Sequence, residues 1–138
     1  MNREILFRGK HIHTIPGNEH LNGTWVHGYL SDENHIYDKS LECELLVDEN
    51  TICQYTGEKD KNGQKIYEGD ILEAHLDDSF PENVTKVRVT WENMKWCMVQ
   101  KGMIPDPFET GEGKDWEVIG NIFDDPELIG ETKNGESR

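Results

Sequence analysis

Short stretches of alternating apolar and polar residues fill most of this chain, and no other feature constrains its fold as strongly. No window longer than ten residues carries the 3.6-residue apolar stripe of an amphipathic helix. β-Branched and aromatic residues, which favour strands, recur in the alternating stretches. The sequence therefore predicts a mainly β protein with few or no long helices. The expected strands are Glu4–Phe7, Thr24–Leu30, Cys43–Val47, Ile52–Tyr55, Lys65–Tyr67, Asp70–Leu76, Val84–Trp91, Trp96–Lys101 and Trp116–Asn121.

Two glycine turns between these strands have a clear local cause. Asn62 and Gly63 lie between two β-prone stretches, and both residue types tolerate the positive φ angles of a type I′ turn. We therefore predict a type I′ hairpin at residues 60–63. Gly69 is expected to form a second hinge, and the short connection 92–95 suits an antiparallel pair of strands. Several strands joined by tight turns favour a small barrel or roll.

The remaining segments carry weaker structural signals. Residues 104–113 contain two prolines and two glycines, which predicts a loop because such a stretch cannot sustain a central strand. Pro126, preceded by acidic residues, is placed to open a single helical turn. Residues 130–138 have no apolar anchor to offset the entropy of ordering them, so we expect a flexible tail.

The composition narrows the possible partners and location. The 138 residues include 28 acidic and 14 basic ones, for a net charge of −14. This charge repels phosphate backbones and anionic lipids unless positive charge is gathered locally. No apolar run approaches the roughly 20 residues of a membrane span, and charged residues interrupt the amino-terminal stretch. Three widely separated cysteines suit reduced thiols, so we expect an intracellular protein without a membrane anchor.

The histidines near the amino terminus are a weak metal-site candidate. On an extended segment, His11 and His13 point to one face, as a two-histidine site requires. His20 or Glu19 can supply a third ligand only if the intervening turn brings it close. An exposed, histidine-rich loop explains the same residues, and we predict no metal site here.

Other polar motifs have simple structural readings. Glu58, Asp60 and Asn62 match the opening of a calcium loop, but its twelfth position is Gly69 in place of the required glutamate. A hairpin turn explains these residues without a metal. The acidic pairs Asp77-Asp78 and Asp124-Asp125 suit solvated loops, and Cys97, between Trp96 and Met98, suits inert packing in a strand. With no nucleotide-binding or nucleophile motif present, the sequence predicts neither an enzyme nor a cofactor.

One segment departs from the acidic balance. If Val87, Val89 and Trp91 face the core, the intervening side chains face outward and form a short basic ribbon. Small barrels bind single strands of nucleic acid by combining such charge with stacking aromatic rings. The alternative is a solvated outer face over a tryptophan-filled core. The candidate nucleic-acid-binding residues are Lys86, Arg88, Lys95 and Lys101, which against Glu92 leave residues 84–101 with a net charge of +3.

The stretch Gln54–Ile71, QYTGEKDKNGQKIYEGDI, resembles the signature of the YopX family of phage and prophage proteins. Further similarity covers Ile5–Lys10, Gly23–Gly28, Trp116–Phe123 and Pro126–Leu128. The resemblance implies a mainly β architecture with an SH3-like barrel or roll and a phage or prophage origin, with no established activity and no functional residues to carry over. Glu58 stands where the family commonly has an apolar residue, and residues 11–21 look like an insertion.

These observations lead to one set of expectations. The chain should form a single β domain over residues 1–129, with additional amino-terminal strands and a barrel part over roughly 52–123. We expect a non-catalytic module of the bacterial host's cytoplasm that binds an unknown protein or itself as a homo-oligomer. The alternative is a nucleic-acid-related accessory role, either weak binding through residues 84–101 or mimicry of DNA by the acidic segments.

Overall fold

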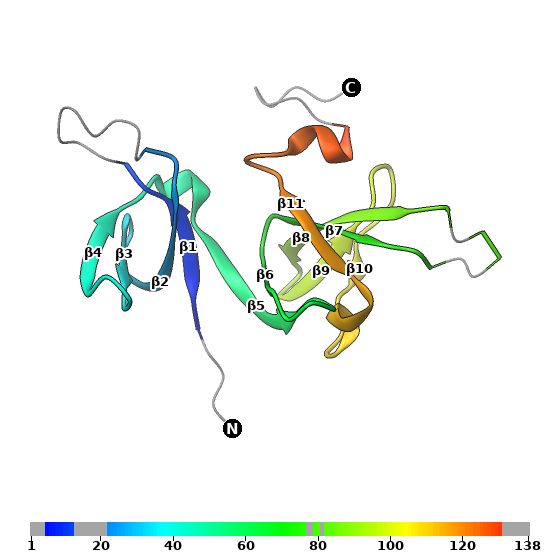
Figure 1. Ribbon diagram of the computed structural model, residues 1–138, viewed down its shortest axis with the longest axis horizontal. Helices are drawn as coiled ribbons and strands as arrows, with labels where there is room; N and C mark the ends of the chain where they lie inside the picture. Colours follow the sequence, from blue (N-terminus) through cyan, green and yellow to red (C-terminus); the bar gives the residue numbers. More distant parts are fainter. Residues whose placement is uncertain (1–4, 13–21, 77–78, 81, 131–138) are drawn as a thin grey trace. The chain divides into compact units, whose positions relative to one another are not determined.

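The computed structural model describes residues 5–12, 22–76, 79–80 and 82–130, and strands dominate this part of the chain (Figure 1). The described residues contain only 3₁₀ helices of three or four residues: η2 (Glu49–Thr51), η3 (Glu112–Asp115) and η4 (Pro126–Ile129). None of the helices in this part is long and apolar enough to cross a membrane. The predicted mainly β class is confirmed, and the two antiparallel sheets formed by the described residues do not close into a barrel.

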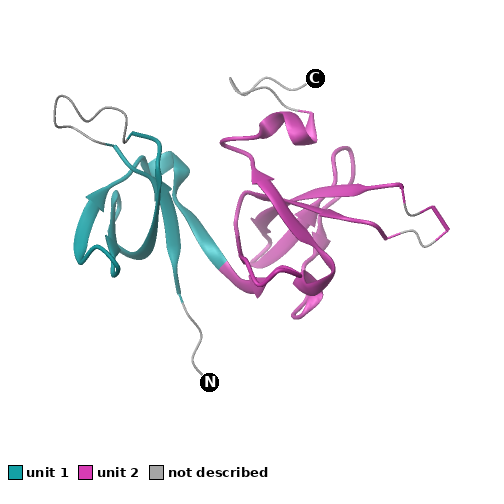
Figure 2. Cartoon of the chain, in the orientation of Figure 1, with its two compact units in different colours: residues 1–55 teal, residues 56–138 magenta. Residues whose placement is uncertain are grey.

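The chain divides into two compact units, residues 1–55 and 56–138 (Figure 2). Strand β5 (Cys53–Lys59) runs across the division. The division lies close to residue 52, where the sequence placed the start of the barrel part. The expectation of one domain over residues 1–129 stays a prediction, and the tail beyond residue 130 lies outside the described residues.

Unit 1 is an antiparallel sheet with the strand order β4-β3-β2-β1-β5. Its strands before β5 are β1 (Phe7–Lys10), β2 (Trp25–Asp32), β3 (His35–Asp38) and β4 (Cys43–Leu46). Val26, Ile36 and Val47 are buried together on its inner face. Just after β1, a bridge joins His11 to Val47, and the His11 ring nitrogen Nδ1 lies 2.8 Å from the Leu46 carbonyl oxygen.

Two strands of unit 1 differ from the sequence-based prediction. The first strand is Phe7–Lys10, whereas Glu4–Phe7 was predicted, because residues 7–10 supply the backbone that pairs with β2. The apolar run around Ile5 favoured the earlier position. Strand β3 was not predicted at all, because its four residues follow a tight turn and carry too little alternation to stand out.

Unit 2 contains a second sheet with the order β10-β9-β8-β7-β11, and strand β6 lies beside β5. Its core gathers apolar side chains from several strands around Ile66, Leu72 and Val89. The predicted antiparallel pairing across residues 92–95 is confirmed. The strands are β6 (Lys65–Tyr67), β7 (Asp70–Ala74), β8 (Thr85–Glu92), β9 (Lys95–Val99), β10 (Asp106–Pro107) and β11 (Glu117–Asn121).

The turn at residues 60–63 is a hairpin, as predicted, but the predicted type I′ geometry is wrong. Gly63 has a φ of +82°, whereas Asn62 does not have a positive φ. The Gly63 N–H bonds to the Asp60 carbonyl, and the Asp60 N–H bonds to the Gln64 carbonyl. The loop therefore has three residues and ends in one left-handed glycine.

The prediction of a loop over residues 104–113 was too broad. Asp106 and Pro107 form the short strand β10, which pairs with Met98 and Cys97 of β9. Because β10 is the edge of its sheet, the missing N–H of Pro107 costs no ladder hydrogen bond. The single helical turn expected from Pro126 is confirmed as η4.

Gly28 offers a direct test of the unit 1 geometry. A Cβ atom at this position would lie 2.0 Å from the Tyr37 carbonyl oxygen, whereas one at Gly63 would meet nothing within 4 Å. We expect Gly28→Ala to lower the free energy of unfolding by about 3 kcal/mol, because backbone must move. Gly63→Ala should cost only about 1–2 kcal/mol, from its left-handed φ. Urea denaturation of both variants checks this, and an equal or smaller loss for Gly28→Ala would contradict it.

Candidate functional site

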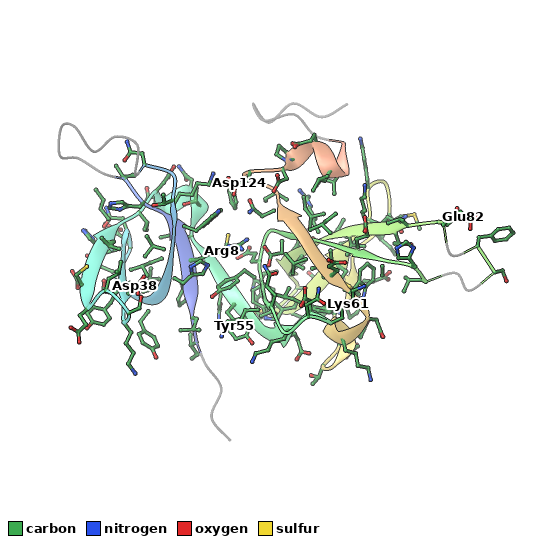
Figure 3. All side chains as sticks on the ribbon, in the orientation of Figure 1. Arg8, Asp38, Tyr55, Lys61, Glu82 and Asp124 are labelled. Carbon is green, nitrogen blue, oxygen red and sulfur yellow. The ribbon has the colours of Figure 1, made fainter. Side chains whose placement is uncertain are left out.

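In the segment 58–62, which resembles a calcium loop, the carboxylate oxygens accept hydrogen bonds from backbone N–H groups. Asp60, which is 5 % exposed, accepts through Oδ1 from the N–H groups of Asn62 at 2.8 Å and Gln64 at 2.9 Å. Its Oδ2 accepts from the N–H of Val118 at 3.0 Å. Glu58 Oε1 accepts from the N–H of Gly111 at 2.7 Å. These carboxylates join the hairpin, whose Lys61 is labelled in Figure 3, to distant parts of unit 2.

The other buried polar side chains of the described residues also have structural partners. Thr56 donates its hydroxyl proton to the Ile66 carbonyl at 2.8 Å. Asp70 accepts from the Tyr67 N–H at 2.7 Å, and Thr51 accepts from the Lys10 N–H at 2.8 Å. The Arg8 guanidinium lies over the Trp25 ring at 4.7 Å. Each of these groups holds the backbone or a neighbouring ring in place.

The acidic pair Asp124-Asp125 is part of a turn around Asn121. The Asn121 side-chain oxygen accepts from the N–H groups of Phe123 and Asp124, both at 2.9 Å. The Asn121 amide nitrogen donates to Asp124 Oδ2 at 3.1 Å, and the Asn121 backbone N–H lies 3.3 Å from Asp125 Oδ2. This pair leads the chain into η4. The other pair, Asp77-Asp78, lies outside the described residues.

The amino-terminal histidines and Cys97 are the remaining candidates for a metal site or a nucleophile. The His11 ring bonds to the Leu46 carbonyl, while His13, Glu19 and His20 lie outside the described residues. Within the described ranges, histidine, cysteine and acidic side chains form no group of three placed to hold a metal ion. Cys97 is buried in β9.

The basic candidates on strand β8 lie on a face of mixed character. Val87 and Val89 are buried, and Lys86 and Arg88 alternate with them on the opposite face. Lys86 is directly opposite Glu73, so an acidic residue accompanies it on that face. Arg88 lies between Ile71 of β7 and Val99 of β9, and Ile71 is fully buried.

The other two basic candidates also have neighbours. Lys95 is opposite Glu92, and the Lys101 Nζ donates to the Gly130 carbonyl at the end of η4, at 3.3 Å. The structure therefore places Lys86 and Arg88 on β8, Lys95 on β9 and Lys101 beyond the end of β9. Whether they bind nucleic acid stays a prediction.

The turn type and the exposed side chains at the tip of the β8–β9 hairpin were not predicted from the sequence. Asn93 and Met94 form a two-residue turn with φ angles of 53° and 67°, which is the type I′ pattern. Met94 is 85 % exposed, and a left-handed conformation costs such a residue about 1–2 kcal/mol. We call residues 91–96 the hairpin tip.

Two tryptophans form the base of the hairpin tip. Trp91 is opposite Trp96, and their rings meet edge to face with centroids 4.8 Å apart. Trp96 packs against the core, whereas Trp91 is 48 % exposed. Trp91 lies on the same face of β8 as Val87 and Val89, as strand alternation requires, but its ring remains half exposed while Val87 and Val89 are buried.

The chain matches a known protein family over most of its length. The family model described as "YopX protein" matches residues 17–130 of the chain. No curated protein matches the chain. The family match covers both β5 and the hairpin held by Asp60, so the segments that carry the resemblance include the hydrogen-bonded framework of unit 2.

Replacing Asp60 should weaken unit 2. In Asp60→Asn, one amide oxygen can still accept from Asn62 and Gln64, but an amide N–H₂ must then face the Val118 N–H. We expect a loss of about 2–3 kcal/mol in the free energy of unfolding, measured by urea denaturation. Asp106→Asn, on an exposed edge strand, is the matched control and should stay within about 0.5 kcal/mol of wild type. Equal losses in both variants would contradict this role.

Replacing Met94 should have the opposite effect. Glycine adopts the left-handed conformation without strain, so Met94→Gly should raise the free energy of unfolding by about 0.5–1 kcal/mol. Asn93→Gly is the control, and should change stability less because asparagine tolerates this conformation. Thermal denaturation of both variants measures the difference. A destabilised Met94→Gly protein would mean that the exposed side chain stabilises the fold.

Proposed function

The chain belongs to the YopX family, and from this premise we propose that it is a non-catalytic accessory protein of a phage or prophage. It acts by binding another protein or a second copy of itself. The hairpin tip is the observation that carries this proposal. It combines a strained turn, an almost fully exposed methionine and a half-exposed tryptophan supported by a second one.

The strain at Met94 argues for a role in binding. A glycine at this position would remove about 1–2 kcal/mol of left-handed strain, so stability alone does not favour methionine here. Methionine side chains adapt to irregular apolar surfaces, and tryptophan is enriched among the residues that dominate binding energy. The fixed hairpin presents both together, which limits the entropy lost on binding.

The non-catalytic part of the proposal rests on how the polar groups are used. In the described residues, buried side chains such as Asp60, Asp70 and Asn121 accept hydrogen bonds from backbone N–H groups. A catalytic acid or base must instead keep an oxygen or nitrogen available to a substrate. Because these side chains accept hydrogen bonds from the backbone, they support a structural role and a protein that acts through its surface.

A nucleic-acid-related role is the second candidate. The observation that favours it is the exposed Trp91 ring on the same hairpin as Lys95, because stacking and positive charge together bind single strands. The acidic partners of Lys86 and Lys95 and the net charge of −14 weigh against it. Mimicry of DNA by the acidic segments is the other form of this second candidate, and its target would be a DNA-binding protein.

The test compares the wild-type protein with the double variant Trp91→Ser/Met94→Gly. Self-association is measured by sedimentation velocity over a concentration series, and binding of other proteins by capture from a bacterial host lysate. We expect at least one of the two to be present in wild type and to fall about tenfold or more in the variant, because hot-spot side chains are lost. Binding of a labelled oligonucleotide at low salt to the wild-type protein and to Arg88→Ala tests the nucleic-acid-related role separately.

The control variant is Met103→Ser/Ile104→Ser, which removes two exposed apolar side chains of unit 2 outside the hairpin tip. It should associate and bind as wild type does. Equal losses in both double variants would indicate general apolar adhesion. Oligonucleotide binding that is lost in Arg88→Ala, without protein binding, would replace the proposal with the second candidate.

A further inference from the structure

The outer face of unit 1 carries two exposed tyrosines side by side. Tyr29 of β2 is directly opposite Tyr37 of β3, and Tyr37 is directly opposite Glu44 of β4. Opposite residues of antiparallel strands share a face, so the three side chains form a row across three strands. Tyr29 is 48 % exposed and Tyr37 is 36 % exposed. We call this row the tyrosine face.

The sheet beneath the tyrosine face is held by its core. Ile36, next to Tyr37 in β3, points to the other side and is fully buried with Val26 and Val47. The Gly28 residue beside Tyr29 lets the Tyr37 backbone approach closely. The two phenol rings are therefore presented on a backbone that is fixed before any partner arrives, which lowers the entropy cost of binding.

Acidic residues outnumber basic ones around the tyrosine face. Strands β2–β4 and their turns contain Asp32, Glu33, Asp38, Glu42 and Glu44, against the single lysine Lys39. The two cations of the neighbouring strand β1, Arg8 and Lys10, lie over the Trp25 ring. The Ser40 hydroxyl, 2.6 Å from Asp38 Oδ1, is the main cause that lowers the pKa of Asp38. The Asn34 N–H, and then the His35 ring, lower the pKa of Asp32. Both aspartates are therefore ionised at neutral pH.

The chemistry of this surface selects a cationic partner. We propose that the tyrosine face is a docking surface for an arginine-bearing segment of another protein. Guanidinium groups stack on tyrosine rings and bond to carboxylates in pairs, so one arginine segment satisfies both features of the face. The same face of the sheet already contains such a contact, since the buried Arg8 guanidinium lies over the Trp25 ring.

The same charge argues against other occupants. Nucleic acids and anionic lipid surfaces are repelled by the acidic residues around the two rings. A second copy of this chain, with its net charge of −14, would bring like charge against the face. The tyrosine face lies in unit 1, whereas the hairpin tip lies in unit 2, so this inference goes beyond the proposed function and does not rest on it.

The probe is a fluorescein-labelled peptide in which five arginines alternate with glycines, titrated at low salt and followed by fluorescence anisotropy. We expect Tyr29→Ser/Tyr37→Ser to lower the affinity about fivefold to tenfold, because two ring–guanidinium contacts are lost. Asp32→Asn/Glu44→Gln should lower it about tenfold, because these two carboxylates lie opposite His35 and Tyr37 on this face. The matched peptide with lysines should bind more weakly than the arginine peptide, because ammonium groups do not stack as guanidinium does.

Asp106→Asn/Glu127→Gln is the control, because it makes the same change in net charge on exposed residues of unit 2. We expect its affinity to stay within twofold of wild type, and circular dichroism verifies that every variant is folded. Equal loss in the control and in Asp32→Asn/Glu44→Gln would show attraction to the whole acidic protein and overturn the proposal. Unchanged binding by the tyrosine variant, equal binding of the lysine peptide, or no binding by wild type would also overturn it.

Discussion

One buried carboxylate organises unit 2. Asp60 receives three backbone N–H groups, two from its own hairpin and one from Val118, 58 positions further along the chain. Next to the bond from Val118, a backbone–backbone hydrogen bond joins the Lys61 N–H to the Trp116 carbonyl. The turn at Gly63, the pairing of β5 with β6 and the position of β11 therefore depend on one another. An apolar side chain at residue 60 would remove the acceptor of all three N–H groups.

Acidic residues serve two different purposes in this protein. Asp60, Asp70 and Asp125 turn their oxygens to nearby N–H groups, where charge strengthens the hydrogen bonds. Others, such as Glu44 beside Tyr37, remain on the surface of unit 1 and give it a strong negative field. Part of the acidic charge thus strengthens hydrogen bonds within the fold, and part of it lies on the surface.

Much of the fold could be predicted because the alternating pattern and β-branched residues mark strands directly. The strand Lys65–Tyr67 and the turn at Pro126 were predicted at their observed positions. The turn types were less accessible: the type I′ turn is at Asn93-Met94, although Asn62-Gly63 has the preferred residues. Pairing geometry decides this, since β8 and β9 meet through a two-residue loop and the Asp60 carboxylate favours a three-residue loop in the other hairpin.

The candidate surfaces were harder to predict than the strands for a physical reason. Alternation places Trp91 on the inner face with Val87 and Val89, yet its ring is half exposed whereas the two valines are buried. Tyr29 and Tyr37 meet only because β3 exists, and β3 had no clear signal in the sequence. Both surfaces arise from register, which depends on contacts between distant residues. Met94 has a positive φ that costs free energy, and its side chain is 85 % exposed, so it contributes little to the stability of the fold. This combination supports a role for Met94 in binding.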